Sequence, residues 1–412
     1  MINYNEEYWN DVKQVINNIP LKEKLYGKTV LITGATGMIC SSIVDILVYL
    51  NRYEQAKIKI ILAGRNAKRT SDTFFNTKDW EPVDIPHDWM IYDSKDLYAQ
   101  GVSCYKKTFT VPALGLDRLS ILFEGVYMDN EIYLNGEKIF TWPYGYSQFE
   151  IDLTSYVKEG ENTIWVKNTY ELPNSRWYPG SGIYRNVWLV RRPAVHFTTD
   201  GGYLSAKKEG DAFILHADYE IQNDTDSACE VTLCHTVLAP DGKVAGTSKE
   251  TLTIPCGLTV NKQTMTFEAP LLWDIESPNL YTVHSEIIKD ETAIDSSDER
   301  FGFRTIAFDP DKGFFLNGRN VKINGSCEHH TLGALGAAIN REAVRRQLTI
   351  MQKMGVNAIR SAHNMPAPEL MELCDEMGLL LYTESFDMWE HCKTDYDYGN
   401  YFKDWWKTDL TS

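Results

Sequence analysis

The sequence predicts a multidomain protein that consists mainly of β-strands, with a short β-α-β unit first and a parallel β/α segment last. Two observations carry this prediction. Short stretches of alternating apolar and polar residues recur from about residue 80 to residue 304, at the spacing of β-sandwiches. After Phe314 the pattern changes to strands that alternate with helices, which favours a parallel sheet. A chain of 412 residues accommodates two to four such domains.

Composition excludes several classes of function. The net charge of -16 disfavours a nucleic-acid or anionic-membrane partner. The polar, acidic start predicts no signal peptide, and no apolar run is long enough to cross a bilayer. The eight cysteines form no Cys-x-x-Cys pair, so neither a zinc knuckle nor a redox motif is indicated. They are typical of free thiols in a reducing compartment, and a cytoplasmic location is expected.

The first segment, residues 1–70, is predicted to be a β-α-β unit. Thr29 to Ala35 is typical of a buried strand, Met38 to Asn51 of a helix, and Lys57 to Ala63 of a second strand. This segment has ten basic against six acidic residues, whereas the rest of the chain has a net charge of -20. The shift in charge and texture places a domain junction between Asn66 and Thr77.

Residues 27–66 resemble the start of the extended short-chain dehydrogenases/reductases, the NAD-dependent epimerases and dehydratases. The resemblance is carried by Thr33-Gly34-Ala35-Thr36-Gly37-Met38-Ile39-Cys40, which follows the family's TGxxGxxG motif except at Cys40. It implies a vestigial, Rossmann-like cofactor site at Gly34, Gly37 and Arg65, where the arginine suits the 2′-phosphate of NADP. The family's Tyr-x-x-x-Lys pair is matched only by Tyr53 and Lys57, before the second strand. NAD(P) binding is therefore not expected.

Two consecutive β-sandwiches are the simplest interpretation of residues 80–304. Turn signals separate the alternating stretches, among them Asn135-Gly136, which tolerates the positive φ angles of a hairpin turn. Pro240-Asp241-Gly242 is a second such turn. In the segment that follows, Asn340 is predicted to cap a helix that Gly355 ends, and Pro368 opens another helix. Short strands precede and follow that helix.

From about Thr77 to Ser412 the chain resembles glycoside hydrolase family 2, the β-galactosidase and β-glucuronidase group. The motifs that carry the resemblance are IPHDW (85–89), FEGVYMDNEIYLNG (123–136), RWYPGSGIYRNVWL (176–189), GFFLNG (313–318), EHHTLGALGAAINREAVRRQL (328–348) and NAIRSAHNMPAPELMELCDEMGLLLYTESFDMW (357–389). The resemblance implies a jelly-roll sugar-binding domain (77–193), an immunoglobulin-like sandwich (194–305) and the N-terminal part of a (β/α)8 TIM barrel (306–412). It also implies retaining, two-glutamate hydrolysis of terminal β-linked sugars.

Carboxylates at the ends of barrel strands are the candidate catalytic groups. Judged from the residues alone, Glu328 and Glu384 are the candidate pair. The resemblance instead places the acid/base in an Asn-Glu pair after the fourth strand and the nucleophile at the seventh strand, both beyond Ser412. We therefore expect no catalytic residue in this chain and no activity from it alone.

The remaining candidates are predicted to bind the substrate, a β-linked saccharide. The resemblance implies that His363 matches a family histidine that faces the sugar, and that Arg176 lies in a sandwich loop that reaches toward the barrel mouth in relatives. Carboxylates and aromatic faces after the third strand suit sugar hydroxyls and C–H groups. A structural role competes with each: Arg360 is expected to brace a carboxylate, and a core position is the alternative for Trp389. The predicted substrate-binding residues are His363, Asn364, Glu384, Asp387, Trp389 and Arg176.

No transition-metal site is predicted. Cys327-Glu328-His329-His330 has ligand residue types, but adjacent strand residues point to opposite faces. No cofactor is required, although magnesium or sodium, which some family members bind, is left open. A homo-oligomer is left open too. The alternatives to a glycosidase are a non-catalytic carbohydrate-binding protein, an NAD(P)-dependent epimerase/dehydratase fragment, and a chimaeric chain without a function of its own.

Overall fold

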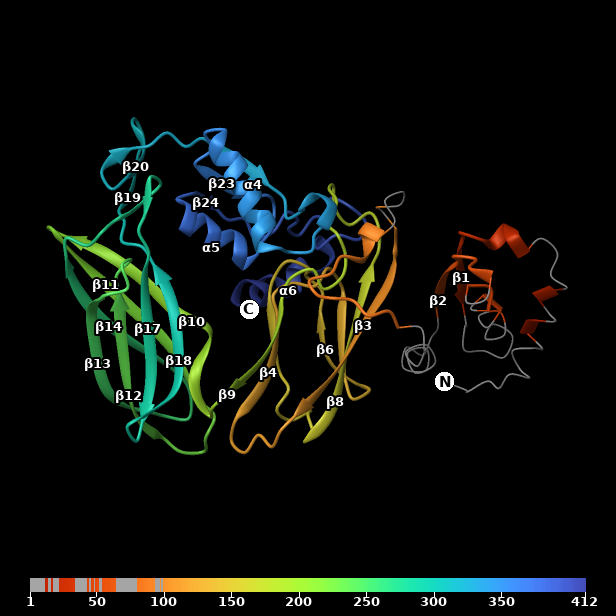
Figure 1. The fold of residues 1–412 in the computed structure, drawn as a ribbon, viewed down its shortest axis with the longest axis horizontal. Coiled ribbons are helices and arrows are strands. Elements are labelled where there is room, and N and C mark those ends of the chain that lie inside the picture. The colour runs from red at the N-terminus through yellow and green to blue at the C-terminus, as the bar shows by residue number, and fades with distance from the viewer. Residues whose placement is uncertain are drawn as a thin grey trace. The chain divides into compact units, whose positions relative to one another are not determined.

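The structure is a computed structural model that describes residues 12–13, 16–17, 22–33, 43, 46–47, 49–51, 54–63, 80–92, 97 and 99–412 (Figure 1). The chain divides into two compact units, Met1–Asp84 and Ile85–Ser412. No helix in the described part of the chain is long and apolar enough to cross a membrane.

The first unit contains the predicted pair of strands. β1 (Thr29–Thr33) lies parallel to β2 (Lys59–Ala63), and the 3-10 helix η1 (Lys22–Leu25) precedes them. Buried apolar side chains from the helical residues and the approach to β2 form one small cluster, which includes Ile16, Leu50 and Ile58. Gly34, Gly37, Cys40 and Arg65 lie outside the described residues, so the cofactor-site prediction on them stays a prediction.

The second unit begins with the first sandwich, which packs two antiparallel sheets face to face. The sheet orders are β3-β8-β5-β6 and β7-β4-β9. Every second residue of β8 from Asn162 to Tyr170 is buried, as the alternating pattern predicts. The predicted hairpin turn joins β5 to β6, with φ angles of 51° at Asn135 and 89° at Gly136. The strands are β3 (Gly101–Val111), β4 (Arg118–Phe123), β5 (Asn130–Leu134), β6 (Glu137–Trp142), β7 (Phe149–Asp152), β8 (Gly160–Tyr170) and β9 (Val187–Arg192).

The second sandwich has the sheet orders β10-β11-β14 and β13-β12-β17-β18. Two apolar clusters, one around Tyr219 and Leu233 and one around Phe303, fill the space between the sheets. The short pair β15 and β16 lies between β14 and β17 in sequence. The strands are β10 (Val195–Glu209), β11 (Ala212–Asn223), β12 (Cys229–Leu238), β13 (Val244–Ile254), β14 (Gly257–Glu268), β15 (Trp273–Asp274), β16 (Ser277–Pro278), β17 (Tyr281–Lys289) and β18 (Thr292–Phe301).

The last part of the chain is the predicted β/α segment. An antiparallel sheet, β19-β20-β21, leads into three parallel strands in the order β22-β23-β24. Asn340 caps α4 by accepting a hydrogen bond from the Ala343 N–H, and Gly378 ends α5 in the left-handed conformation. The elements are β19 (Ile306–Asp309), β20 (Gly313–Leu316), β21 (Arg319–Asn320), β22 (Gly325–Glu328), η3 (Gly333–Leu335), α4 (Arg341–Lys353), β23 (Ala358–Ser361), α5 (Pro368–Met377), β24 (Leu380–Tyr382) and α6 (Gly399–Thr411).

Asp88, just before the 3-10 helix η2 (Trp89–Tyr92), links the first sandwich to the β/α segment. Its buried carboxylate accepts hydrogen bonds from the N–H groups of Met90, Ser181 and Ala337 and from the Tyr178 hydroxyl. The backbone approaches this carboxylate closely from both sides. A Cβ atom added at Gly180 would lie 2.6 Å from Asp88 Oδ2, and one added at Gly336 would lie 2.4 Å from it.

Two further contacts join the first sandwich to the β/α segment. The buried Arg185 guanidinium donates to the carbonyl oxygens of Tyr146 (2.9 Å) in the sandwich and Met365 (2.8 Å) after β23. Ser147 donates to Asp409 of α6 at 2.7 Å. Figure 1 shows α6 beside this sandwich. The loops that follow β23 and β24 are therefore fixed against the first sandwich.

The second sandwich contacts the helical side of the β/α segment. The Trp273 indole N–H donates to the Asp375 carbonyl at 2.8 Å, and Arg300 forms ion pairs with Glu372 and Glu376 of α5. Gly378 packs so closely on this sandwich that an added Cβ would lie 2.4 Å from the Ile275 carbonyl oxygen.

Candidate functional site

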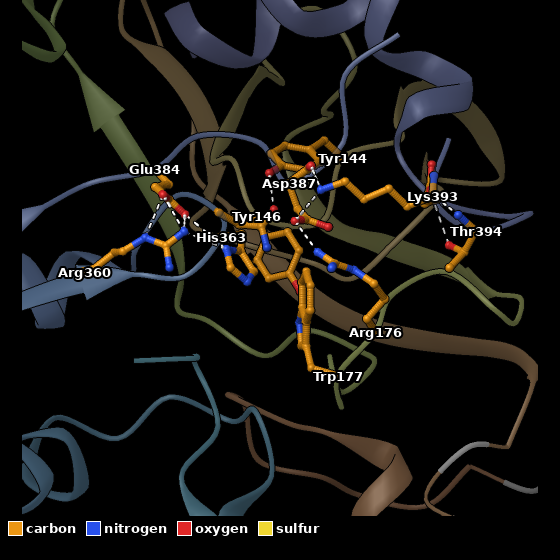
Figure 2. Close-up of polar contacts among 12 residues, drawn as sticks. Tyr144, Tyr146, Arg176, Trp177, Arg360, His363, Glu384, Asp387, Lys393 and Thr394 are labelled. Carbon is orange, nitrogen blue, oxygen red and sulfur yellow. Dashed lines mark hydrogen bonds and ion pairs between the residues drawn. The ribbon is translucent and has the colours of Figure 1, made fainter. Parts of the chain in front are cut away.

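The first part of the candidate site is an ion-pair cluster at the ends of β23 and β24. Arg360 holds Glu384 through two parallel hydrogen bonds, Nε to Oε1 at 2.8 Å and Nη2 to Oε2 at 2.9 Å (Figure 2). His363 Nδ1 lies 3.2 Å from the same Oε2. Arg360 therefore braces a carboxylate, as predicted. With both Glu384 oxygens and His363 Nδ1 engaged, Nε2 is the ring nitrogen that remains for a ligand.

The second part is centred on Asp387, three residues after Glu384. Its Oδ1 accepts from Arg176 Nη2 at 2.7 Å and from Lys393 Nζ at 2.8 Å. The Asp387 side chain is only 4% exposed, whereas that of Arg176 is 52% exposed. Burial alone would raise the pKa of Asp387, but Lys393 and Arg176 outweigh it and hold the pKa below its ordinary value. Asp387 therefore stays ionised in mildly acidic solution.

An aromatic wall from the first sandwich completes this part of the site. The Trp177 ring lies 5.0 Å from the His329 ring and 5.3 Å from the His363 ring, centroid to centroid. Its indole N–H donates to the Tyr146 hydroxyl at 3.2 Å. Sequence reasoning missed Trp177 and His329 as site residues. Trp177 could have been predicted, because it follows Arg176 in the sequence. The family resemblance implies that the loop containing both residues reaches toward the barrel.

The side chains of residues Cys327 to His330 have separate surroundings and do not converge on one point. Cys327 Sγ lies 3.4 Å from Arg360, His329 packs on Trp177, and His330 Nε2 lies 2.7 Å from the Pro179 carbonyl oxygen. Burial lowers the pKa of His330 to about 4, so this ring is neutral near pH 7. Glu328 lines a cavity of about 40 Å³, and burial raises its pKa to about 7. Within the described ranges, no group of three or more His, Cys, Asp or Glu residues could hold a metal ion.

Magnesium or sodium, which the family resemblance left open, stays a prediction. Hard cations need several oxygen ligands. Arg360 engages both oxygens of Glu384, and Arg176 and Lys393 share Asp387 Oδ1. Asp387 Oδ2 is buried and has no hydrogen-bond partner among the described residues.

The other two predicted site residues lie differently. Tyr144 of the first sandwich contacts Asn364 Oδ1 at 2.9 Å and donates to the Ser385 carbonyl, which joins Asn364 to the segment after β24. Trp389 is 69% exposed and lies outside the two ion-pair clusters. The structure thus brings together His363 with Glu384 and Arg176 with Asp387, places Asn364 beside them, and leaves Trp389 on the surface.

Glu328 and Glu384 come from strands that are not adjacent in the sheet. Glu328 ends β22 and Glu384 follows β24, with β23 between these two strands. Neighbouring strands are roughly 4.8 Å apart, so the two backbones are separated by roughly 10 Å. The arrangement provides hydrogen-bonding groups and an aromatic wall for a polar ligand.

Three domains of one family match the chain in order. Residues 78–193 match the sugar-binding domain of glycosyl hydrolases family 2, residues 203–304 match glycosyl hydrolases family 2, and residues 310–400 match the family's TIM barrel domain. The predicted fold class is confirmed for these parts: a sugar-binding jelly roll, an immunoglobulin-like sandwich and part of a TIM barrel. The comparisons give no support to the dehydrogenase/reductase resemblance of residues 27–66.

The β-galactosidase BoGH2A of Bacteroides ovatus is 40% identical over 354 residues, which are 82% of this chain and 41% of that protein. A β-glucuronidase of Bacteroides fragilis is 30% identical over 74% of this chain and 46% of its own length. The crystal structure of a β-glycosidase from Bacteroides vulgatus has a TM-score of 0.76 and 36% identity, covering 82% of this chain and 45% of that one.

The chain spans less than half the length of each of these relatives. The order of the three matching domains is also the order of the two sandwiches and the β/α segment in the structure. Over residues 78–400, the chain belongs to glycosyl hydrolases family 2.

Proposed function

We propose that this chain carries the sugar-binding part of a β-glycosidase of the β-galactosidase type, which acts on terminal β-linked sugars by the retaining two-glutamate mechanism. The observation that carries the proposal is the contact of Arg176, from the sandwich, with Asp387, from the end of the third barrel strand. This contact builds one polar site from two domains, next to His363 and Trp177. Two of the relatives, one a β-galactosidase and one a β-glucuronidase, support the same reaction class.

We propose further that these 412 residues alone do not hydrolyse glycosides. Residues 306–412 contain no Asn-Glu pair. Glu384 is engaged by Arg360, and Glu328 lies two strands away from it. With 4-nitrophenyl β-D-galactopyranoside we expect no release of nitrophenol above that in buffer. Turnover that Glu384→Gln abolishes would contradict this proposal.

Sugar binding tests the remainder of the site. Titration with methyl β-D-galactopyranoside should give a saturable signal that is lost in His363→Ala, because this substitution removes the ring nitrogen that remains for a ligand. Arg191→Ala is the matched control, since Arg191 pairs with Asp117 on the surface of the same sandwich. A signal that survives His363→Ala would place sugar binding elsewhere.

A non-catalytic carbohydrate-binding protein is the second candidate, and the same ligand-facing groups favour it. The coding sequence after Ser412 separates the two. Glutamates after a fourth and at a seventh strand favour the glycosidase, and an immediate stop codon favours the binding protein. For the NAD(P)-dependent alternative, we expect the fluorescence of the reduced nicotinamide to stay unchanged when the protein is added.

A further inference from the structure

The sandwich loop 173–178 is anchored at both ends by groups that do not face the site. The Tyr396 N–H donates to the Pro173 carbonyl at 3.0 Å, and the Tyr127 hydroxyl donates to Asn174 Oδ1 at 3.1 Å. At the other end, the Tyr178 hydroxyl donates to Asp88. In the middle of the loop, the Trp177 carbonyl accepts from Ser175 Oγ at 2.7 Å and its indole N–H donates to the Tyr146 hydroxyl at 3.2 Å. The face of the Trp177 ring and the Arg176 side chain are positioned by further side-chain contacts.

Arg176 lies between Trp177 and the barrel. Its guanidinium carbon is 5.8 Å from the centre of the Trp177 ring, within reach of a cation–π interaction, while its Nη2 holds Asp387 at 2.7 Å. Figure 2 shows Arg176 directed to Asp387 and Trp177 directed toward Tyr146 and His363. The ion pair thus fixes the arginine, and the arginine covers one face of the indole.

His363 is held from two sides. On one side its Nδ1 lies 3.1 Å from Arg360 Nη2 and 3.2 Å from Glu384 Oε2, and on the other the Trp177 ring packs on it at 5.3 Å. The first contact fixes which nitrogen remains for a ligand, and the second restricts the tilt of the ring. An imidazole held in this way presents Nε2 in one direction.

We propose that Arg176 is a positioning residue: its ion pair with Asp387 holds Trp177 against His363 and so orients His363 Nε2 toward a hydroxyl group of the β-linked sugar. This inference rests on the proposed function. It differs from a direct contact between Arg176 and the sugar, because the arginine acts through Trp177.

We expect the surrounding fold to stay intact when Arg176 is replaced. Lys393 still neutralises Asp387 at 2.8 Å, and the loop ends keep their own hydrogen bonds. A fall in sugar affinity in Arg176→Gln therefore reports on positioning rather than on unfolding.

A double-mutant cycle tests the route of action. The wild type, Arg176→Gln, Trp177→Ala and the double variant are titrated with methyl β-D-galactopyranoside by saturation-transfer NMR. Arg176→Gln should weaken binding by about fivefold, the range of a partly exposed ion pair. Trp177→Ala should weaken binding at least as much, and the double variant should match Trp177→Ala. Additive losses would mean that Arg176 touches the sugar itself and would overturn the proposal.

A second readout needs no sugar. In protein with isotope-labelled histidine, the His363 Cε1–H signal, assigned by its absence in His363→Gln, should shift in ligand-free Arg176→Gln toward its position in Trp177→Ala. Arg191→Gln should leave it in place, because the Arg191–Asp117 pair lies on the sandwich surface. An unchanged signal in Arg176→Gln would refute the proposal. If the wild type binds no galactoside yet the signal shifts, the proposed function fails and the positioning role holds.

Discussion

The two β-sandwiches are built alike but contact the β/α segment differently. Each packs a three-stranded sheet on a four-stranded sheet. The first contributes buried polar groups, such as Asp88 and Arg185, to the loops around the strand ends. The second meets α5 through partly exposed ion pairs of Arg300. Ligand groups of such barrels lie at the carboxyl ends of the strands. Location, rather than fold, therefore decides which sandwich contributes to the site.

Asp88→Ala should give the largest loss of stability. It tests whether the buried contacts of the first sandwich are stronger than the partly exposed ion pairs of the second. The substitution leaves four donors around a buried position without their acceptor. We expect the free energy of unfolding to fall by about 3 kcal/mol. Urea denaturation measures this, with Asp117→Ala, which removes an exposed ion pair, as the control. Similar small losses in both variants would contradict the buried role of Asp88.

Gly378→Ala probes the interface of the second sandwich. Gly378 has φ of 71°, and a Cβ atom there meets the Ile275 carbonyl oxygen at 2.4 Å. Backbone strain and the clash together should lower the free energy of unfolding by about 2 kcal/mol. Gly355→Ala separates these causes, because Gly355 has φ of 87° with nothing near the added Cβ. Equal losses in the two variants would show that strain alone acts.

Glu328 lines a cavity together with Tyr146 of the first sandwich. The substitution Glu328→Gln should change how the free energy of unfolding depends on pH. Burial raises the pKa of Glu328 to about 7 from an ordinary value of 4.5. The folded protein therefore binds this proton more tightly than the unfolded chain does. The resulting stabilisation is full below about pH 4.5 and is lost as the pH rises to about 7.

Glutamine stays neutral, so the difference in stability between pH 5 and pH 8 should shrink by about 1–2 kcal/mol, allowing for solvent screening. Urea denaturation at the two pH values measures it. The control is Glu150→Gln, since the Glu150 pKa is lowered: burial opposes ionisation, but hydrogen bonds from Ser120 and Thr199 and the Arg192 charge outweigh it. This control should lose stability mainly at the higher pH. A Glu328→Gln variant with the wild-type pH profile would exclude the raised pKa.

Arg300→Gln should have the smallest effect. Its pairs with Glu372 and Glu376 are partly exposed, and Arg341 also holds both glutamates. We expect a loss below about 1 kcal/mol that diminishes further in concentrated salt, because salt screens exposed charges. Denaturation at low and high salt measures this. If the free energy of unfolding falls as much as in Asp88→Ala, the contacts of the two sandwiches with the β/α segment do not differ in strength.

Local patterns predicted the elements better than the site. The alternation in β8 and β11 and the Asn340 helix cap were visible in the sequence because periodicity and capping are local effects. The partner of Arg176 was not visible, since 211 residues separate it from Asp387. The family resemblance placed the loop of Arg176 near the barrel mouth, but it did not identify Asp387 as the partner of Arg176. Trp177 and His329 were missed because their roles arise from ring packing between domains.

The close approach of backbone to the Asp88 carboxylate restricts how this region can vary among related sequences. Gly180 and Gly336 adopt φ angles of 71° and 61°, and each faces the same Oδ2 atom. A side chain at Gly180 would also meet Ala337 Cβ at 2.4 Å, and one at Gly336 would also meet Ile91 Cγ2 at 2.3 Å, so a shorter residue at position 88 alone would not make room. Such a residue would also deprive Ala337 and Tyr178 of their acceptor. We therefore expect a change at Gly180, Gly336 or Asp88 to be accommodated only together with changes in the side chains around it.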